Sequence, residues 1–427
     1  MASILVLTLV VLLVSPTVCT SLYHSNPKAG FQLTLKRVDS DGNLTKFELL
    51  RGAMKRGRKR MDRLHELTHA ASNVSINAPI HAGEGEFLMD LSIGTPPVPF
   101  SAILDTGSDL TWIQCKPCQL CFDQPTPIFD PKKSSSFSKL PCSSDLCKAL
   151  PLLSCNDGKC EYLYVYGDYS TTKGVMGIET FTFENVSVPR IGFGCGFDNE
   201  GGGFQGAGLV GLGRGQLSLV SQLNSPKFSY CLMPFGSNKT SILLMGSRAS
   251  HVNTTSIKLT TPLIKIPPTP FYLVSLKGIT VGETLLPINN SNFELNKKHG
   301  YPNMIVDSGT TFTMLEESAF NLVKEEFTNQ IKLPVSEGEF ELCLTLPPDG
   351  GHFKVPKLIF NFEGADLELP AENYFITDLN SGMGCLAMEY SNIGISIFGN
   401  IQQQNYLMLY DLVKETLSFA PTQCDHL

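Results

Sequence analysis

The chain has 427 residues, of which 42% are hydrophobic and 17% charged, so it can bury a large core and is not intrinsically disordered. Its 37 Gly and 27 Pro residues favour many short strands joined by turns over a bundle of helices. The net charge is -7, and since nucleic-acid-binding proteins are usually basic, the charge argues against that class.

The N-terminus has the features of a secretory signal peptide. The run from Ile4 to Val14 is apolar apart from Thr8, and small residues follow it as far as Thr20. This run is too short to cross a bilayer but has the length of the apolar core of a signal peptide. We predict a signal peptide over residues 1–20, with a buried N-terminal segment as the alternative. No other stretch is long enough to span a membrane, and the polar C-terminal end argues against a GPI anchor.

A basic segment, residues 21–82, precedes an acidic body. It carries eleven Lys and Arg residues against five Asp and Glu residues. Between residues 49 and 67, apolar side chains recur at roughly helical spacing among the basic ones. A solvated basic helix, a membrane-surface helix and a removable prosegment are the alternatives, and Gly52 and Gly57 argue against the second. The prosegment hypothesis explains why this positive charge stands before a negative body.

The cysteine content indicates disulfide bonds. Of the 13 cysteines, Cys19 falls within the predicted signal peptide, which leaves an even number in a chain bound for an oxidising compartment. The spacing Cys-x-x-Cys-x-x-Cys over residues 115–121 could instead hold a metal or an iron–sulfur cluster, but disulfides are favoured in a secreted chain. The twelve candidates are Cys115, Cys118, Cys121, Cys142, Cys147, Cys155, Cys160, Cys195, Cys231, Cys343, Cys385 and Cys424.

Glycosylation sequons point to the same compartment. Each N-x-[S/T] match alone is weak evidence, but several together fit a glycosylated secretory protein. They begin at Asn43, Asn73, Asn185, Asn238, Asn253 and Asn289.

From residue 87 onward the composition is that of an all-β protein. Residues 87–93 form a strand-like run ended by a Gly/Pro turn, and residues 161–166 are rich in β-formers. One helix is predicted over residues 316–331, where four apolar side chains share a face. They are Phe320, Val323, Phe327 and Ile331.

Two segments repeat one pattern 202 residues apart. Ala102-Ile-Leu-Asp105-Thr-Gly-Ser108 and Met304-Ile-Val-Asp307-Ser-Gly-Thr310 both place Asp-[Thr/Ser]-Gly-[Ser/Thr] after an apolar run. One Asp-Ser-Gly often only starts a turn, but two copies in this context indicate a shared function. Gly lets another backbone approach each Asp, and the hydroxyls can donate hydrogen bonds that orient its carboxylate. The supporting residues are Thr106, Gly107, Ser108, Ser308, Gly309 and Thr310.

If two such loops met face to face, their carboxyl groups could activate a water molecule together. Facing carboxyl groups cannot both ionise, so they share one proton and can hold a water between them. The ionised member takes a proton from this water, which attacks a carbonyl carbon, and the protonated member hydrogen-bonds the developing oxyanion. This chemistry needs no covalent intermediate, metal or other cofactor.

With these motifs the chain resembles the pepsin-type aspartic proteases, and more narrowly the nepenthesin-type enzymes of plants, over about residues 84–427. The resemblance implies an all-β, bilobal double-barrel with an active-site cleft between the lobes. A signal peptide and a partly helical prosegment precede it. The implied division is an N-terminal lobe over residues 83–247, containing a cysteine-rich insertion, and a C-terminal lobe over residues 248–427. In this resemblance Asp105 and Asp307 are the catalytic pair.

The resemblance extends to the flap, the hairpin that closes over substrate. Residues 164–170 resemble it, so Tyr166 corresponds to the flap tyrosine, with Gly167 after it, and Trp112 stands where the family places the indole that hydrogen-bonds that tyrosine. Without the resemblance, both aromatic rings could serve ordinary packing. Tyr169 is a departure, because many relatives have Gly there, and a bulky residue would stiffen the tip or change the turn.

Further elements match the family. Leu209-Val-Gly211 and Ile397-Phe-Gly399 resemble the two hydrophobic-hydrophobic-Gly elements that support the catalytic loops. Ser308 stands where pepsins often carry Thr, a replacement that is frequent in the plant group. The resemblance also implies a disulfide pairing, which sequence alone does not establish. It is Cys115–Cys118, Cys121–Cys195, Cys142–Cys160, Cys147–Cys155, Cys231–Cys424 and Cys343–Cys385.

The resulting hypothesis is a secreted, monomeric aspartic endopeptidase that acts on proteins or peptides at acid pH. We expect it in the apoplast, with the vacuole as the other destination. Its own prosegment would inhibit it until a cut between Ser75 and Glu86. A catalytically silent pepsin-fold inhibitor or binding protein of the plant cell wall is the main alternative. A glycosidase with two carboxylates would not explain the duplicated motif.

Overall fold

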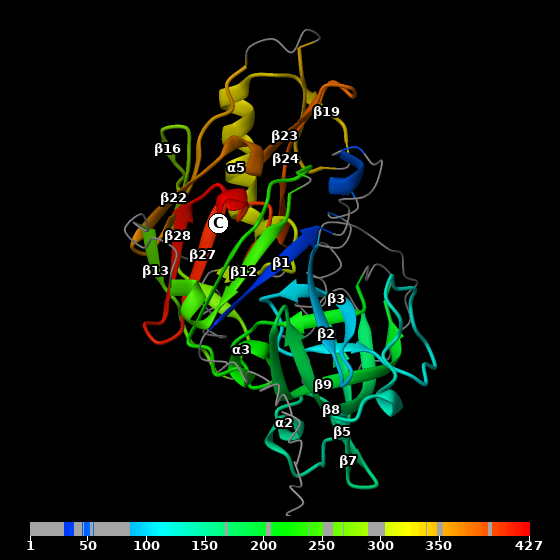
Figure 1. Cartoon of the computed structure of the whole chain (residues 1–427). Helices are drawn as coiled ribbons and strands as arrows, with labels where there is room; N and C mark the ends of the chain where they lie inside the picture. The colour runs from blue at the N-terminus through cyan, green and yellow to red at the C-terminus, as the bar shows by residue number, and fades with distance from the viewer. Residues whose placement is uncertain are drawn as a thin grey trace, which may run out of the picture.

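Strands dominate the structure, as the composition predicts (Figure 1). This computed structural model describes residues 30–37, 45, 47–51, 54, 86–166, 170–201, 206–237, 239–250, 259–267, 269–288, 304–338, 340–347, 353–391 and 395–427. The predicted signal peptide lies outside these ranges, as does most of the basic helix, of which residues 47–51 and 54 are described as helical. None of the helices in the described ranges has the length and apolar character needed to cross a membrane.

The largest sheet joins distant parts of the chain. Its 15 strands are β1 (Phe31–Arg37), β2 (Phe87–Ile93), β3 (Val98–Asp105), β4 (Trp112–Gln114), β5 (Ser138–Lys139), β6 (Leu153–Asn156), β7 (Lys159–Val165), β8 (Thr171–Phe183), β9 (Val186–Glu200), β10 (Gly208–Gly211), β11 (Lys227–Cys231), β12 (Ser241–Met245), β13 (Leu259–Pro262), β27 (Tyr406–Asp411) and β28 (Thr416–Pro421). They are ordered β13-β28-β27-β11-β12-β1-β2-β3-β10-β4-β9-β8-β7-β6, and β5 pairs with β8. An additional pairing of β2 with β8 curls this sheet toward a barrel.

Three smaller sheets belong to the second half of the chain. Their strands are β14 (Tyr272–Val274), β15 (Leu276–Val281), β16 (Thr284–Leu285), β17 (Met304–Val306), β18 (Thr313–Glu316), β19 (Val335–Ser336), β20 (Cys343–Thr345), β21 (Leu358–Phe362), β22 (Ala365–Leu369), β23 (Phe375–Asp378), β24 (Met383–Leu386), β25 (Met388–Ser391) and β26 (Ser396–Phe398). The strand orders are β14-β17-β26-β18-β25, β16-β15-β21-β22 and β19-β20-β24-β23.

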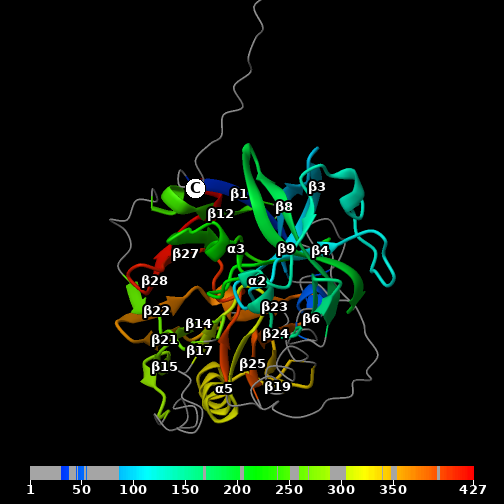
Figure 2. The same cartoon turned by 90° about the horizontal axis from the view of Figure 1, so that it is seen from below.

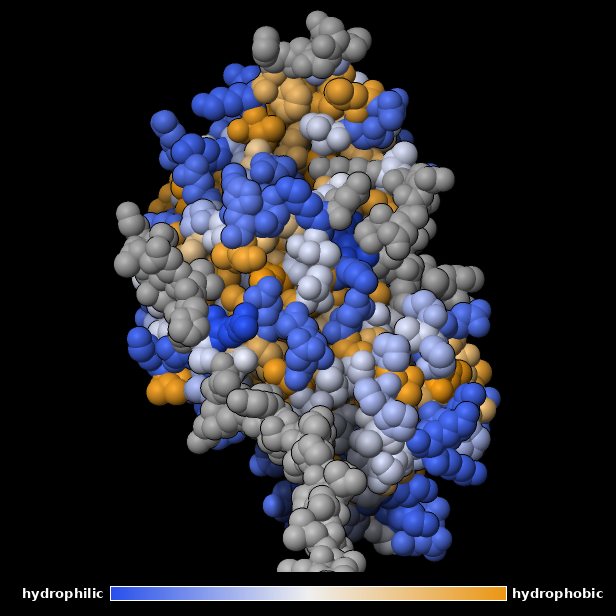
Figure 3. All heavy atoms as spheres, viewed as in Figure 1, coloured by the Kyte–Doolittle hydropathy of each residue, from blue (hydrophilic) through white to orange (hydrophobic). Residues whose placement is uncertain are grey.

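The two halves form a bilobal all-β fold, as predicted. Figure 2 shows α5 (Glu317–Ile331) and the smaller sheets on one side, with β1, β3, β8 and β9 on the other. The last strands of the chain return to the largest sheet, where β27 pairs with β11. On the face in Figure 3, hydrophilic residues cover much of the surface, and hydrophobic residues lie between them. Most large apolar side chains are instead buried, which is the main source of stability in such a fold.

The predicted helix is confirmed as α5. Glu316 caps its N-terminus, where its side chain accepts the backbone N–H of Ser318 at 3.1 Å. Lys332 ends the helix in the left-handed conformation, with φ of 55°. The predicted apolar face is buried. Two further helices have four residues each, α2 (Asp145–Lys148) and α3 (Leu219–Gln222).

All twelve candidate cysteines form disulfides, but the predicted pairing is only partly right. The pairs Cys231–Cys424 and Cys343–Cys385 are confirmed. The predicted pairs Cys115–Cys118, Cys121–Cys195, Cys142–Cys160 and Cys147–Cys155 are wrong. The structure instead pairs Cys115–Cys195, Cys118–Cys121, Cys142–Cys155 and Cys147–Cys160.

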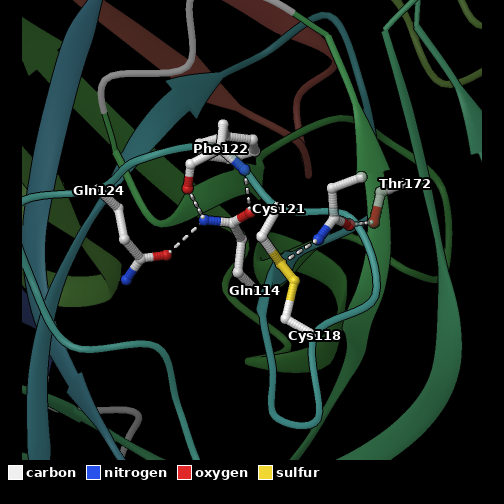
Figure 4. The surroundings of a disulfide bond; sticks show 7 residues. Gln114, Cys118, Cys121, Phe122, Gln124 and Thr172 are labelled. Carbon is white, nitrogen blue, oxygen red and sulfur yellow. Dashed lines mark hydrogen bonds between the residues drawn. A yellow bond between two sulfur atoms is a disulfide. The ribbon is translucent and has the colours of Figure 1, made fainter.

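The correction follows from strand pairing and burial. β4 runs parallel to β9, so that Ile113 lies opposite Cys195, and the backbone of Cys115 continues this pairing with a hydrogen bond to Gly196. Cys118 and Cys121 are left within one short loop, where they bond to each other (Figure 4). In the insertion, the fully buried Cys147 pairs with the fully buried Cys160, and the more accessible Cys142 and Cys155 form the other bond. With these sulfurs bonded, no thiolate remains at residues 115–121 for the metal site considered as the alternative.

Gln114 shapes the loop that holds the short disulfide. Its side chain is buried and clamps Phe122, accepting the Phe122 N–H at 3.0 Å and donating to the Phe122 carbonyl at 2.9 Å (Figure 4). It also donates to Gln124 at 2.7 Å. A buried amide with its hydrogen-bonding capacity used in this way fixes a loop that has little regular structure.

Candidate active site

The two Asp-[Thr/Ser]-Gly motifs stand at corresponding strand ends. β3 ends at Asp105 and pairs in parallel with β10, in which Gly211 lies opposite Asp105. β17 ends one residue before Asp307 and pairs in parallel with β26. Strand β10 contains the first predicted hydrophobic-hydrophobic-Gly element, and β26 contains the two apolar residues of the second, which Gly399 follows directly. Both elements therefore lie beside the strands that lead into the two motifs.

The glycines that end these two elements allow close backbone contact. A Cβ at Gly211 would lie 2.3 Å from the backbone of Asp109, and one at Gly399 would lie 2.3 Å from the backbone of Phe312. Atoms at that distance overlap, so only glycine lets the supporting element pack against the chain that leaves each motif.

Each aspartate accepts hydrogen bonds from two donors at corresponding positions of its own motif. Asp105 accepts the N–H of Gly107 at 2.9 Å on Oδ1 and the hydroxyl of Ser108 at 2.6 Å on Oδ2. Asp307 accepts the N–H of Gly309 at 2.8 Å on Oδ1 and the hydroxyl of Thr310 at 2.6 Å on Oδ2. The two carboxyl groups are therefore in matching environments.

The two loops are bound to each other through reciprocal hydrogen bonds. The Thr106 N–H donates to Ser308 Oγ at 3.0 Å, and the Ser308 N–H donates to Thr106 Oγ1 at 2.9 Å. The structure thus brings together the motifs that sequence repetition singled out. Asp105 and Asp307 are 0% and 2% exposed, so their environment is that of the protein interior rather than of water.

The strands β7 and β8, which flank the segment predicted to be the flap, pair antiparallel. Tyr166 follows β7 and donates its N–H to the Ser170 carbonyl at 2.9 Å. Its ring is buried, with its centroid 6.4 Å from that of the fully buried Trp112. Burial raises the pKa of Tyr166 well above its usual value, so its hydroxyl stays protonated. The predicted roles of Gly167 and Tyr169 concern residues outside the described ranges.

Sequence reasoning overlooked Asp109, a third acid near the pair. Its Oδ1 accepts the Gly215 N–H at 2.8 Å, and the glycines at 213 and 215 leave room for the carboxyl group. Burial, opposed by this hydrogen bond and assisted by the charge of Asp105, raises the pKa of Asp109 to about 6. The sequence held a signal for this residue, because Asp109 directly follows the first motif. The structure adds that its side chain faces a glycine-rich segment.

Other predicted site residues are less informative. Within the described part of the chain, no three His, Cys, Asp or Glu side chains gather in a way that could hold a metal ion. Asn185 is exposed in the turn between β8 and β9, where a glycan could be attached. The asparagines of the other five sequons lie outside the described residues.

Comparisons with known proteins show the family of the chain. The family described as "Xylanase inhibitor N-terminal" matches residues 87–247, and "Xylanase inhibitor C-terminal" matches residues 271–421. The chain is 51% identical to aspartic proteinase nepenthesin-1 of Nepenthes gracilis, with 99% of this chain and 98% of the relative covered. It is 48% identical to nepenthesin-2 of the same plant, with the same coverage.

A solved structure supports the fold. The crystal structure of Basic 7S globulin from soybean is similar with a TM-score of 0.62, at 18% identity, over 82% of this chain and 98% of that one.

An all-β bilobal fold with two matching Asp-[Thr/Ser]-Gly loops defines the class of aspartic peptidases. The chain belongs to the pepsin-type aspartic proteases and, within them, to the nepenthesin-like group. It is an aspartic-type endopeptidase.

Proposed function

We propose that Asp105 and Asp307 are the catalytic pair of a secreted endopeptidase that is made as a zymogen and works at acid pH. The observation that carries this proposal is the reciprocal bonding of Thr106 and Ser308, which joins the two aspartate loops directly. A pair of isolated turn-forming aspartates would have no reason to share such a contact.

The mechanism follows from two carboxyl groups in matching settings. One proton is shared between them, because two like charges at short range are not both retained. A water between the carboxyl groups loses a proton to the ionised member and attacks the peptide carbonyl carbon. The protonated member donates to the oxygen that becomes negative. The tetrahedral species then collapses as its C–N bond breaks. The proton that the first aspartate took from the water passes to the leaving nitrogen.

The acid optimum follows from the same proton. Activity requires that one of the two carboxyl groups is protonated, so the rate should fall once the pair loses this proton. The donors Ser108 and Thr310 favour the ionised form of the aspartate that each one contacts. A pair with one proton therefore persists only in acid.

The zymogen proposal is supported by contacts of the basic segment. β1 lies between β2 and β12 and pairs with both. Lys36 forms an ion pair with Asp90 at 2.7 Å, and the Arg37 guanidinium lies 3.5 Å from the centre of the Phe235 ring. A segment held by strand pairing and ion pairs leaves only when these contacts are weakened. Acid weakens the ion pairs because it protonates carboxylates of the body.

The helical part of the segment adds apolar contacts. Four of its side chains are buried in a cluster with Phe340, whose ring centroid is 5.5 Å from that of Phe47. These four are Phe47, Leu49, Leu50 and Met54. Contacts of this kind with the second lobe would keep the segment docked beside both lobes until it is cut, which we place between Ser75 and Glu86.

Secretion as a monomer to the apoplast, with the vacuole as the other destination, completes the proposal. Six disulfides support an oxidising compartment. Sequencing the N-terminus of the protein recovered from plant extracellular fluid tests secretion and processing together. Absence of the protein from that fluid would contradict secretion, and retention of residues 1–20 would contradict processing.

A second candidate is inhibition of a cell-wall hydrolase, since both matching family models are described as xylanase inhibitors. One assay separates the two. Acid-treated protein is incubated with a denatured protein substrate, with and without pepstatin, and in parallel with a xylanase. We expect pepstatin-sensitive cleavage and unchanged xylanase activity. Loss of xylanase activity without cleavage would favour the inhibitor.

A further inference from the structure

A buried hydrogen-bond network lies behind the two aspartate loops and has no role in the chemistry described above. Its members are Tyr230 on β11, Tyr410 on β27, and Gln403 in the segment between β26 and β27. All three are 0% exposed. β11 belongs to the predicted N-terminal lobe, residues 83–247, and β27 lies near the C-terminus, so the network joins parts of the chain assigned to different lobes.

One end of the network reaches the backbone of Asp307. The Tyr230 hydroxyl donates to Gln403 Oε1 at 2.6 Å. Gln403 Nε2 in turn donates to the Phe398 carbonyl at 2.7 Å and to the Asp307 carbonyl at 3.3 Å. The carbonyl of one aspartate is therefore held by an amide whose orientation Tyr230 determines.

The other end reaches the Thr106 side chain. The hydroxyls of Tyr230 and Tyr410 lie 3.0 Å apart. Burial raises the pKa of Tyr410 far above its usual value, and the neighbouring side chains of Tyr230 and Thr106 oppose that shift. Thr106 is also the residue that accepts the Ser308 N–H, so the network contacts the bond that joins the two loops.

The aromatic rings give the network a rigid frame. The Tyr410 ring stacks on Phe228 with centroids 4.4 Å apart and an angle of 7° between the planes. It also meets the Tyr272 ring edge-on at 4.7 Å. A ring packed on two sides cannot swing to find other partners, so its hydroxyl is confined to the position beside Tyr230.

The chemistry of this network suits positioning rather than proton transfer. Both phenols stay protonated at any pH at which the enzyme would work, since burial raises the pKa of each far above its usual value. They therefore remain donors throughout. Apolar side chains at these positions would also be buried, but they could not hold a carbonyl and a hydroxyl at a fixed hydrogen-bonding distance.

We propose that Tyr230, Gln403 and Tyr410 are positioning residues that hold the Asp307 carbonyl beside the Thr106–Ser308 contact, and so set the relative placement of the two carboxyl groups. The inference rests on the proposed catalytic pair. It predicts a catalytic defect without a binding defect, because none of the three side chains is exposed to substrate.

The test compares three Tyr→Phe variants in the full-length chain after acid activation. Tyr230→Phe and Tyr410→Phe each remove one hydroxyl of the network and keep the ring. Tyr374→Phe is the matched control, since Tyr374 is also buried and its hydroxyl donates to the Pro356 carbonyl at 2.7 Å, away from the two loops. For each variant, kcat and KM are measured with a peptide substrate across about pH 2 to 7, together with the melting temperature.

We expect kcat to fall by roughly 10-fold in Tyr230→Phe and Tyr410→Phe with KM unchanged within about twofold, and the pH limits of kcat to move. The double variant should lose less than the product of the two single losses, because the hydroxyls act in one network. Tyr374→Phe should keep the wild-type kcat and pH profile. Wild-type kcat and pH profile in either network variant, or equal loss in all three variants in step with melting temperature, would overturn the inference.

Asp105→Asn, measured in parallel, separates this inference from the proposed function. If Asp105→Asn is active, the proposal that Asp105 and Asp307 are the catalytic pair is wrong. If Asp105→Asn is inactive while the network variants have wild-type kinetics, only the proposed positioning role is wrong.

Discussion

Thr106 and Ser308 exchange hydrogen bonds across the junction of the two lobes, each donating its N–H to the hydroxyl oxygen of the other. Each hydroxyl then donates to a backbone carbonyl of the opposite loop, Thr106 to Val306 at 3.3 Å and Ser308 to Leu104 at 3.1 Å. Neither aspartate loop can shift without breaking bonds to its counterpart. The active site is thus assembled by contact between the lobes, not by either lobe alone.

Removing one hydroxyl of this exchange should damage both stability and activity. Ser308→Ala deletes the acceptor for the Thr106 N–H and the donor to Leu104, leaving buried groups unpaired. We expect a loss of about 1–3 kcal/mol in unfolding free energy and a lower kcat. Ser308→Thr keeps the hydroxyl and should keep most of both. Denaturant unfolding and peptide hydrolysis check this, and equal behaviour of the two variants would contradict it.

Asp109 should make the folded protein more stable in acid than at neutral pH. Its pKa is raised from 3.8 to about 6, so the folded state binds a proton more tightly than the unfolded state does. This contribution is complete only well below the unfolded value and is lost as pH rises through about 6, so that roughly 2 kcal/mol of it disappears between pH 4 and 7. Asp109→Asn should remove this pH dependence while keeping an oxygen for the Gly215 N–H.

The measurement for Asp109 is urea unfolding at both pH values. Asp145→Asn serves as the control, because the Asp145 side chain is 91% exposed and should not affect the difference. An unchanged pH dependence in Asp109→Asn would show that its carboxyl group is not responsible.

Weakening the docking of β1 should speed activation. Arg37→Ala removes the guanidinium that lies over Phe235, a contact of about 0.5–2 kcal/mol. We expect the full-length chain to convert to its trimmed form at a higher pH and faster than wild type, followed on denaturing gels. Lys133→Ala, at an exposed position in the first lobe, is the control. Conversion at the wild-type pH and rate would argue that β1 does not restrain the enzyme.

The paired aspartate loops and α5 could be predicted from the sequence because their signals are local. An apolar run followed by Asp-[Thr/Ser]-Gly specifies a strand and its end, and four apolar residues at helical spacing specify the buried face of α5. Repetition of the first pattern was enough to predict that Asp105 and Asp307 act together.

Other features depended on contacts that the sequence does not encode locally. The partner of Cys115 is decided by the pairing of β4 with β9, across 80 residues. The bond between Tyr230 and Gln403 joins positions 173 residues apart, and neither belongs to a recognisable motif. The basic segment was expected to be a separate unit, yet β1 is an internal strand of the largest sheet.

The most direct test of the account is the hydrolysis rate of Asp105→Asn and Asp307→Asn in acid. Asn preserves the shape of each side chain but cannot share a proton or accept one from water. We predict that either variant, folded as judged by its melting temperature, loses at least about 10³-fold in kcat. Near-normal turnover by either variant would contradict the claim that the two carboxyl groups activate one water between them.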